Sequence, residues 1–338
     1  MRRWILVFVA TLAACGGGAS PAPTPTTPSP PSPPAPAPTN WPITGRIVSA
    51  PASGPIAAAS VTFGDLAPLT TDGSGRYTIV TTDTSTKPLT IAAAGYLTRE
   101  TSLTGGEART GVDFDLIGTE PEFPREQYLH LTRNGFEGPN KHEPTRHWTA
   151  NPNIYIGTTW RGLDGRSTEA QITPESLAFV ISEIRRIVPL WSAGTLQAGI
   201  IESGPESRTP TKGWITVQYG RSGNWSLLGV DPGWVQLGSE GTCQSLAIIH
   251  EFGHALGYWH SSVRPSIMGG GPGRCELYDL TPNEAAIARV MYSRPPGNIE
   301  PDKDGPPPPP PPVHTLLPRL YADGAPAPAV RCDNRLPR

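Results

Sequence analysis

The stretch HEFGHALGYWH, residues 250–260, places three histidines, one glutamate and two glycines in eleven positions. The chain of 338 residues contains only seven histidines, so nearly half of them lie here. The apolar run SLAIIH that leads into the stretch predicts a helix. In a helix, His250 and His254 lie on one face with Cβ atoms about 5–6 Å apart. The stretch therefore predicts a helix that presents two imidazoles to a common point, and the surrounding fold must be arranged around it.

The residue types in this stretch predict a catalytic metal site. His250 and His254 can bind one zinc ion at Zn–N distances of about 2.0–2.1 Å. Gly257 lets the chain leave the helix in a left-handed conformation, which brings His260 back as a third ligand. Three protein ligands leave a fourth position for water, as in catalytic zinc sites. Glu251 is then the predicted general base, which passes a proton from that water to the leaving amine during peptide hydrolysis.

The eleven residues match H-E-x-x-H-x-x-G-x-x-H and resemble the active-site motif of the metzincin zinc peptidases. Met268, within RPSIMGG, resembles the methionine turn of that family, and Ser261 after His260 resembles its matrixin branch. The family's order of strand, helix, further strands, active-site helix, methionine turn and last helix also matches residues 119–298. The resemblance implies an α/β (α+β) metzincin-type domain there, with a mixed twisted sheet and an active-site helix, acting as a zinc metalloendopeptidase.

Two features depart from that family. Some metzincins have a zinc-binding tyrosine two residues after the turn methionine, whereas this chain has Gly270 there. The latency segment of matrixins carries a zinc-capping cysteine before the catalytic unit, but no cysteine lies between Cys15 and Cys243. The segment VRCDN around Cys332 resembles that latency motif only faintly and lies at the other end of the chain. We therefore expect neither a tyrosine ligand nor a latency role for Cys332.

The rest of residues 119–298 alternates between strand and helix patterns. NPNIYIGT, LQAGIIES, WITVQYG and WVQLG predict strands. A long helix is expected after Thr173 as N-cap and Pro174 at the first helical position. A last helix is expected after Thr281, with Pro282 in its first turn and Glu284 completing a capping box. The apolar face of the long helix comprises Leu177, Val180, Ile181, Ile184, Ile187, Val188 and Trp191.

Residues 41–118 predict a small β-sandwich. Short β-type runs such as ITGRIVS, ASVTFGD and RYTIVTT are separated by turn signals such as TDGSG. The pieces ITGRIV, TTDGSGRYTI and AAGYLTRE resemble the carboxypeptidase regulatory-like (transthyretin-like) sandwich. No nucleophile, carboxylate pair or ligand cluster is present in this segment, so we expect a spacer or a binding module.

The N-terminus MRRWILVFVATLAAC predicts export. A charged start, a short apolar run and small residues are typical of a signal peptide rather than a membrane helix. LAAC resembles the lipobox of bacterial lipoproteins, which implies cleavage after residues 1–14 and lipidation of Cys15. The alternative is an ordinary signal peptide cleaved near Ala14. The first reading predicts a protein anchored to the cell envelope, at the outer membrane or cell surface, unless it is released.

Two proline-rich tracts predict linkers. Residues 16–40 contain PAPTPTTPSPPSPPAPAP and cannot build a core, so an extended stalk is expected. Residues 299–312 end in seven consecutive prolines, and residues 313–338 have little periodicity, so a proline-rich disordered tail is expected over 299–338.

Export makes disulfide formation feasible. Cys243 and Cys275 flank the histidine segment, and a bridge between them would contribute roughly 3–4 kcal/mol on the loop-entropy model. A bridge between Cys275 and Cys332 is the alternative. The four remaining histidines are expected to be solvated rather than ligands: His130, His142, His147 and His314.

The net charge of −2 gives no reason to expect a nucleic-acid partner. A peptide or protein substrate could add to the edge of the sheet by main-chain hydrogen bonds. The family resemblance implies that residues 269–279 wall the site. Structural calcium is common among relatives, but no acidic cluster here specifies it. The rival interpretations are an inactive zinc-binding surface lipoprotein that binds proteins or glycans, and a purely structural envelope component.

Overall fold

The computed structural model describes residues 40–119, 121, 123–161, 168–205, 208–220, 224–238, 244–269, 279–309 and 329–331. The chain from Thr39 onward belongs to one compact unit. The fold is mixed α/β, with β-sheets predominating and four helices among the described residues. The predicted signal peptide, the first linker, His314 and all four cysteines lie outside the described residues, so neither the lipidation of Cys15 nor the predicted disulfide is addressed.

The first part consists of two sheets around one core, which agrees with the sandwich expected for residues 41–118. One sheet has the order β4-β1-β7 and the other β3-β2-β5-β6. In RYTIVT, alternate residues are buried, as the two-residue repeat of a half-buried strand requires. The strands are β1 (Trp41–Ala50), β2 (Ser60–Phe63), β3 (Leu69–Thr70), β4 (Arg76–Thr81), β5 (Thr86–Ala92), β6 (Arg99–Thr104) and β7 (Phe114–Ile117).

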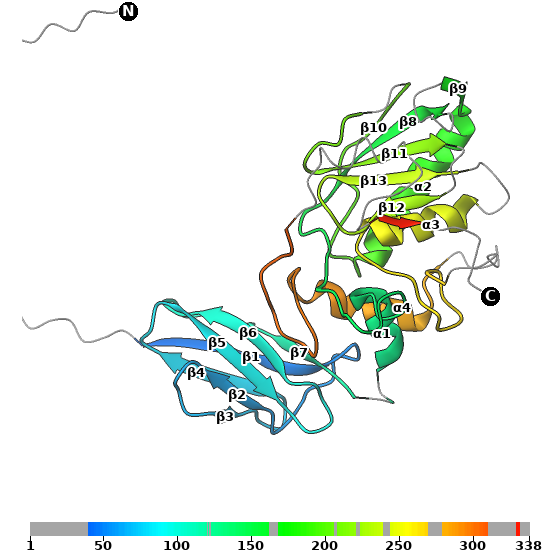
Figure 1. The fold of residues 1–338 in the computed structure, drawn as a ribbon. Helices are drawn as coiled ribbons and strands as arrows, with labels where there is room; N and C mark the ends of the chain where they lie inside the picture. The colour runs from blue at the N-terminus through cyan, green and yellow to red at the C-terminus, as the bar shows by residue number, and fades with distance from the viewer. Residues whose placement is uncertain are drawn as a thin grey trace, which may run out of the picture. The chain divides into compact units, whose positions relative to one another are not determined.

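The second part is built on one mixed sheet, with the order β10-β8-β11-β13-β12-β14 and β9 beside β8 (Figure 1). β8, β10, β11 and β13 are parallel to one another, whereas β12 is antiparallel to both β13 and β14. Neither β9, β12 nor β14 was predicted. The strands are β8 (Asn153–Arg161), β9 (Thr168–Gln171), β10 (Ile201–Gly204), β11 (Trp214–Gly220), β12 (Trp225–Leu227), β13 (Gly233–Leu237) and β14 (Ala329–Arg331).

The two helix starts predicted from caps are confirmed. Thr173 Oγ1 accepts a hydrogen bond from the Ser176 amide at 3.1 Å, and Thr281 and Glu284 form a capping box. The long helix buries five of the seven residues of its predicted face, namely Val180, Ile184, Ile187, Val188 and Trp191. The first helix was not predicted. The helices are α1 (Arg125–Arg133), α2 (Pro174–Trp191), α3 (Gln244–Ala255) and α4 (Pro282–Tyr292).

Trp191, at the end of α2, fixes the position of α3. Its indole Nε1 donates to the Ile249 carbonyl at 2.8 Å, and its own carbonyl accepts from the Tyr258 hydroxyl at 2.6 Å. The two aromatic rings lie 4.4 Å apart between centroids. Each buried polar atom of this pair therefore has a partner, as burial requires. The result is a rigid support beneath the helix that carries the histidines.

The prediction of a disordered tail over residues 299–338 is wrong for two segments, because the folded part continues past residue 298 and Ala329–Arg331 form strand β14. Asp302 is fully buried and its carboxylate accepts from the Arg294 guanidinium at 2.7 Å. Arg294 also pairs with Asp115 at 2.6 Å, and Asp115 pairs with Arg99 of β6 at 2.6 Å. These contacts attach the sandwich to the segment after α4, which proline content alone did not reveal.

His147 is buried rather than solvated, which corrects the prediction made for it. Its Nδ1 lies 3.0 Å from the Trp148 carbonyl oxygen and its Nε2 lies 3.0 Å from that of Arg294. Its ring packs on Tyr292 at 4.6 Å. Burial lowers the pKa of His147. The polar neighbours of His147 in sequence gave no sign that this segment packs against the end of α4.

No helix among the described residues is long and apolar enough to cross a membrane.

Candidate metal centre

Helix α3 carries the first two histidines. Ile248, Ile249 and Phe252 on this helix are fully buried, so the core fixes its rotation. The spacing of four residues then places His250 and His254 together, with ring centroids 4.8 Å apart. The predicted helix is confirmed, and it directs both imidazoles to one point.

Gly257 ends this helix with a turn that only glycine tolerates. Its φ is +113°, and a Cβ atom here would lie 1.7 Å from the Arg146 carbonyl oxygen. Its amide donates to the His254 carbonyl at 2.8 Å, and the Trp259 amide donates to the Leu131 carbonyl at 2.7 Å. The chain is thereby fixed on both sides of the turn and returns with His260 as predicted.

The three imidazoles converge through the same ring atom. The Nε2 atom of His254 lies 3.1 Å from that of His250 and 3.2 Å from that of His260. One ligand atom from each of the three histidines lies within 4.8 Å of the others. Nitrogens about 2.0–2.1 Å from one tetrahedral cation are separated by roughly 3.3 Å. The two separations measured from His254 are close to that value.

The opposite ring nitrogens fix the tautomers. Each Nδ1 faces an acceptor oxygen: the Ile267 carbonyl at 2.8 Å for His250, the Tyr258 carbonyl at 2.6 Å for His254, and a Glu137 carboxylate oxygen at 2.5 Å for His260. Each Nδ1 must therefore donate, which leaves a lone pair on each Nε2 of a neutral ring. Three converging lone pairs repel one another, and a shared cation removes that repulsion. The donor set thus fits a divalent metal ion.

Two of the rings are biased toward the neutral form. Burial, followed by the proximity of His260, lowers the pKa of His250 to about 4. Burial, followed by the neighbouring histidines, places the pKa of His254 well below its ordinary value. Neutral imidazole is the form that binds metals, so these rings are suited to ligation at neutral pH.

Glu251 lies beside the first histidine and is fully buried. Its backbone carbonyl accepts a hydrogen bond from the Ser226 hydroxyl of β12 at 2.8 Å, which attaches this part of α3 to the sheet. The acidic residue predicted as general base therefore lies on the helix that carries two of the three converging imidazoles. The outer edge of β12 pairs with β14 of the chain's own C-terminal part.

Met268 lies beneath the site helix. It is fully buried, and a Cβ atom added to Gly253 of α3 would lie 2.6 Å from its sulfur and 3.1 Å from Trp191. The glycine inside the histidine stretch therefore permits this close approach. The Met268 carbonyl accepts from the Ser261 amide at 3.0 Å, which connects the methionine to the residue after His260.

Glu284 holds the segment around Met268, a role that sequence reasoning missed. Its Oε1 accepts from the Ser266 hydroxyl at 2.7 Å and from the Ile267 amide at 2.8 Å, while its Oε2 accepts from the Thr281 amide at 2.9 Å. The carbonyl of Ile267 in turn receives the Nδ1 proton of His250. One buried carboxylate thus caps α4 and positions the peptide that orients a histidine. The capping-box pattern located this residue but not its second partner.

Several predicted features stay outside the centre or outside the described residues. His130 and His142 do not join the three-histidine cluster, and within the described ranges no second group of three metal-binding side chains converges. Most of the predicted wall segment 269–279 lies outside the described residues. Glu137, which contacts His260, was not among the predicted site residues and lies over a hundred positions away in sequence.

Comparisons with known proteins give little further information. No family model matches the chain, and no curated protein matches it. Two solved structures of mutant type II cohesin–X-dockerin complexes from Acetivibrio cellulolyticus, an N-terminal and a C-terminal interface mutant, each share 21% sequence identity with it. They match 23% and 22% of this chain at TM-scores of 0.20 and 0.19. The match spans 58% and 56% of those chains, less than two thirds of their length.

Proposed function

We propose that this protein is a zinc-dependent metalloendopeptidase with a metzincin-type, matrixin-like catalytic domain. The observation that carries the proposal is the convergence of three Nε2 lone pairs, with Glu251 on the same helix as two of them. The sequence motif, the position of Met268 under the helix and the mixed sheet support the same assignment. The donor set of three neutral imidazoles is the type that zinc prefers.

The protein groups have separate tasks in this mechanism. His250, His254 and His260 would hold the ion. A bound zinc ion lowers the pKa of its water toward about 7 and polarises a carbonyl group. Glu251 accepts a proton from the attacking water and donates it to the amine of the broken peptide bond. The burial of Glu251 keeps bulk water from competing for that proton transfer.

The substrate we propose is an extracellular or cell-envelope protein. The lipobox-like segment ending at Cys15 supports export and lipid anchoring to a membrane, and the proline-rich linker would hold the enzyme away from that surface. The sandwich, similar to regulatory-like modules, is proposed as a spacer or binding module with no catalytic group of its own.

The test uses the full-length chain, because Arg294 of the catalytic part pairs with Asp115 of the sandwich strand β7. Metal content is measured together with cleavage of an unstructured protein, with and without a zinc chelator. We expect one zinc per chain and cleavage that the chelator abolishes. Glu251→Gln should retain the metal and lower kcat by roughly 10²–10⁴-fold. Glu175→Gln makes the same chemical change at the exposed start of α2, so it should leave both the metal content and kcat unchanged.

Each other outcome has a distinct meaning. A chain that binds zinc but cleaves nothing would favour the inactive zinc-binding lipoprotein. A chain that binds no zinc would remove the basis of the proposal. Full turnover in the Glu251→Gln protein would refute the role assigned to that carboxylate.

A further inference from the structure

The third histidine is oriented differently from the other two. His250 and His254 donate their Nδ1 protons to backbone carbonyls, which are neutral acceptors. His260 donates to a side-chain carboxylate oxygen of Glu137 at 2.5 Å. The His260 side chain is 8% exposed and that of Glu137 is 38% exposed. The centre therefore receives one negative charge from outside the histidine stretch.

The loop that presents Glu137 is fixed by its own backbone. Asn134 ends α1 in a left-handed conformation, and the Gly135 amide donates to the Leu129 carbonyl at 2.9 Å. The Gly138 amide then donates to the Asn134 carbonyl at 2.8 Å. These bonds form a tight turn around Glu137. The carboxylate is thus placed by the local fold and not only by its contact with His260.

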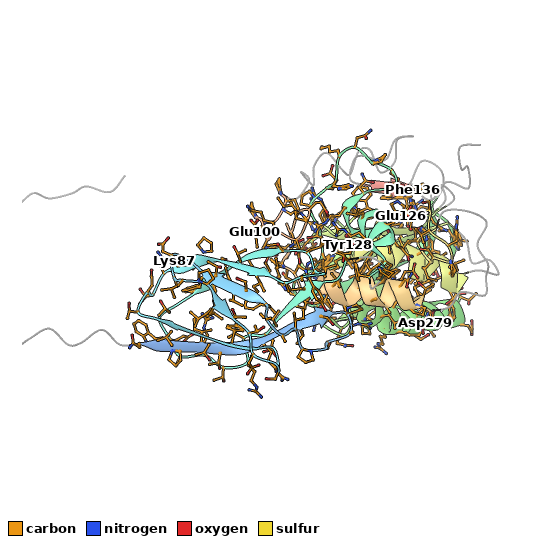
Figure 2. All side chains as sticks on the ribbon, turned by 90° about the horizontal axis from the view of Figure 1, so that it is seen from below. Lys87, Glu100, Glu126, Tyr128, Phe136 and Asp279 are labelled. Carbon is orange, nitrogen blue, oxygen red and sulfur yellow. The ribbon has the colours of Figure 1, made fainter. Side chains whose placement is uncertain are left out.

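The same segment is attached to the turn that carries His260. The Leu131 carbonyl of α1 accepts from the Trp259 amide at 2.7 Å. His130 Nδ1 lies 3.5 Å from the Ser261 hydroxyl, and its ring lies 5.7 Å from that of Phe136. Figure 2 shows Tyr128 and Glu126 on α1 and Phe136 beyond the end of this helix. The residues on both sides of His260 therefore contact α1, so Glu137 and His260 are held in register.

We propose that Glu137 is a positioning residue for the metal centre, which fixes the tautomer and ring orientation of His260 and adds a negative charge that strengthens cation binding. The proposal rests on the metal site of the proposed function. A carboxylate behind a ligating imidazole holds the ring so that Nε2 presents its lone pair, and increases the electron density that this nitrogen donates. Loss of such a group typically lowers metal affinity about 10–100-fold.

The first experiment tests whether the charge of Glu137 strengthens zinc binding. The zinc affinity of the full-length chain is measured by competition with a chromophoric chelator at fixed pH and salt. We expect Glu137→Ala to raise the Kd about 10–100-fold. Glu137→Gln removes the charge but keeps an oxygen acceptor, so its loss of zinc affinity should be smaller than that of Glu137→Ala. Glu143→Gln is the matched control, because it removes one charge from the same segment where Glu143 pairs with exposed Lys141. It should bind zinc like the unchanged protein.

The ring tautomer gives a readout that needs no metal. Long-range ¹H–¹⁵N spectra of the metal-free chain show which nitrogen of His260 carries the proton, with the signal assigned from a His260→Gln variant. We expect the Nδ1–H form in the unchanged protein and in Glu143→Gln, and a loss of this preference in Glu137→Ala. A residue that only stabilised the loop would not alter this signal.

The outcomes separate this inference from the proposed function. Zinc binding that is equally tight with and without the Glu137 carboxylate, together with an unchanged tautomer, would overturn the inference while leaving the peptidase proposal standing. Failure of the unchanged protein to bind zinc would overturn the peptidase proposal, and the tautomer would still show whether Glu137 orients His260.

Discussion

The candidate metal centre and the ion-pair junction both bury several polar groups, but the two sites differ in whether the chain itself supplies the partners of opposite charge. The junction comprises Arg99, Asp115, Arg294 and Asp302, where each cation faces a carboxylate of the same chain. At the metal centre three imidazoles of the same kind meet through lone pairs. Burying polar groups costs free energy unless partners compensate it. The charged groups of the junction find their partners within the chain. The three imidazoles all offer lone pairs, so they are suited to a cation that comes from outside the chain.

The junction shows how this compensation works. Although burial opposes ionisation, the nearby Asp115 and Asp302 carboxylates raise the pKa of Arg294. Burial likewise opposes ionisation of Asp302, yet the Arg294 guanidinium keeps the pKa of that carboxyl below its usual value. The two side chains are inaccessible to solvent. Each charge is therefore stable only while its partner remains.

The largest effect is expected from breaking the junction. Asp302→Asn leaves the Arg294 charge buried with one carboxylate fewer, and loss of one partner of a buried pair costs about 3–5 kcal/mol. Denaturant titration of the full-length chain gives the free energy of unfolding, and the difference between the variant and the unchanged protein measures this cost. The difference in unfolding free energy between this variant and the unchanged protein should be the same with and without zinc, because the junction contains no metal ligand.

The matched control is the exposed pair of Lys303 and Glu100, 2.8 Å apart and next to the junction in sequence. Glu100→Gln should cost no more than about 1 kcal/mol, because water replaces the lost partner. Equal losses in the two variants would contradict the distinction between buried and exposed pairs in this part of the chain.

A smaller effect is expected at the metal centre, and only when metal is present. Zinc at 100 times its Kd should raise the free energy of unfolding of the unchanged protein by about 2.7 kcal/mol. His254→Ala removes the imidazole whose Nε2 lies beside those of His250 and His260. The stabilisation by zinc should therefore disappear in this variant. Unfolding curves with and without zinc give the measurement, and Asp302→Asn is the control that should keep its increment. An undiminished increment in His254→Ala would place the zinc elsewhere.

The segment around Met268 should respond to loss of the Glu284 charge. Glu284→Gln keeps one acceptor oxygen but replaces the other with an NH2 group. Either the buried Ser266 hydroxyl and Ile267 amide or the Thr281 amide then lose their acceptor, which costs about 1–3 kcal/mol. Glu175→Gln is the control, because it changes the corresponding first turn of α2, which is exposed and also follows a Thr-Pro start. Thermal unfolding measures both. A loss no greater than that of the control would show that the carboxylate does not hold this segment.

The smallest expected effect is a dependence on acid pH. Because the pKa of Asp302 is lowered in the folded chain, its contribution to stability is fully present above about pH 4 and is lost as pH falls further. Asp302→Asn lacks this contribution, so the stability difference between the two proteins should shrink below that pH. Unfolding titrations between pH 7 and pH 2 test it, and a constant difference across the range would contradict the assignment.

The sequence determined the local parts of this protein. Helix α3, the glycine turn and the three converging histidines follow from residues 245–260, because helical spacing and a left-handed turn are properties of short segments. The caps of α2 and α4 were predicted for the same reason. The apolar period of α2 also identified the face that this helix buries.

Only the tertiary structure showed which distant residues complete these parts. Glu137 contacts His260, Glu284 supports the peptide behind His250, and Asp302 neutralises Arg294. The sequence around Glu137 and Asp302 resembles an ordinary polar loop and a proline-rich tail. Hydrogen bonds across 123, 17 and 8 residues have no periodic signal, since they depend on how strands and helices pack. The convergence of the three histidines was therefore readable from the motif, but the orientation of their rings and the neutralisation of buried charge were decided by packing.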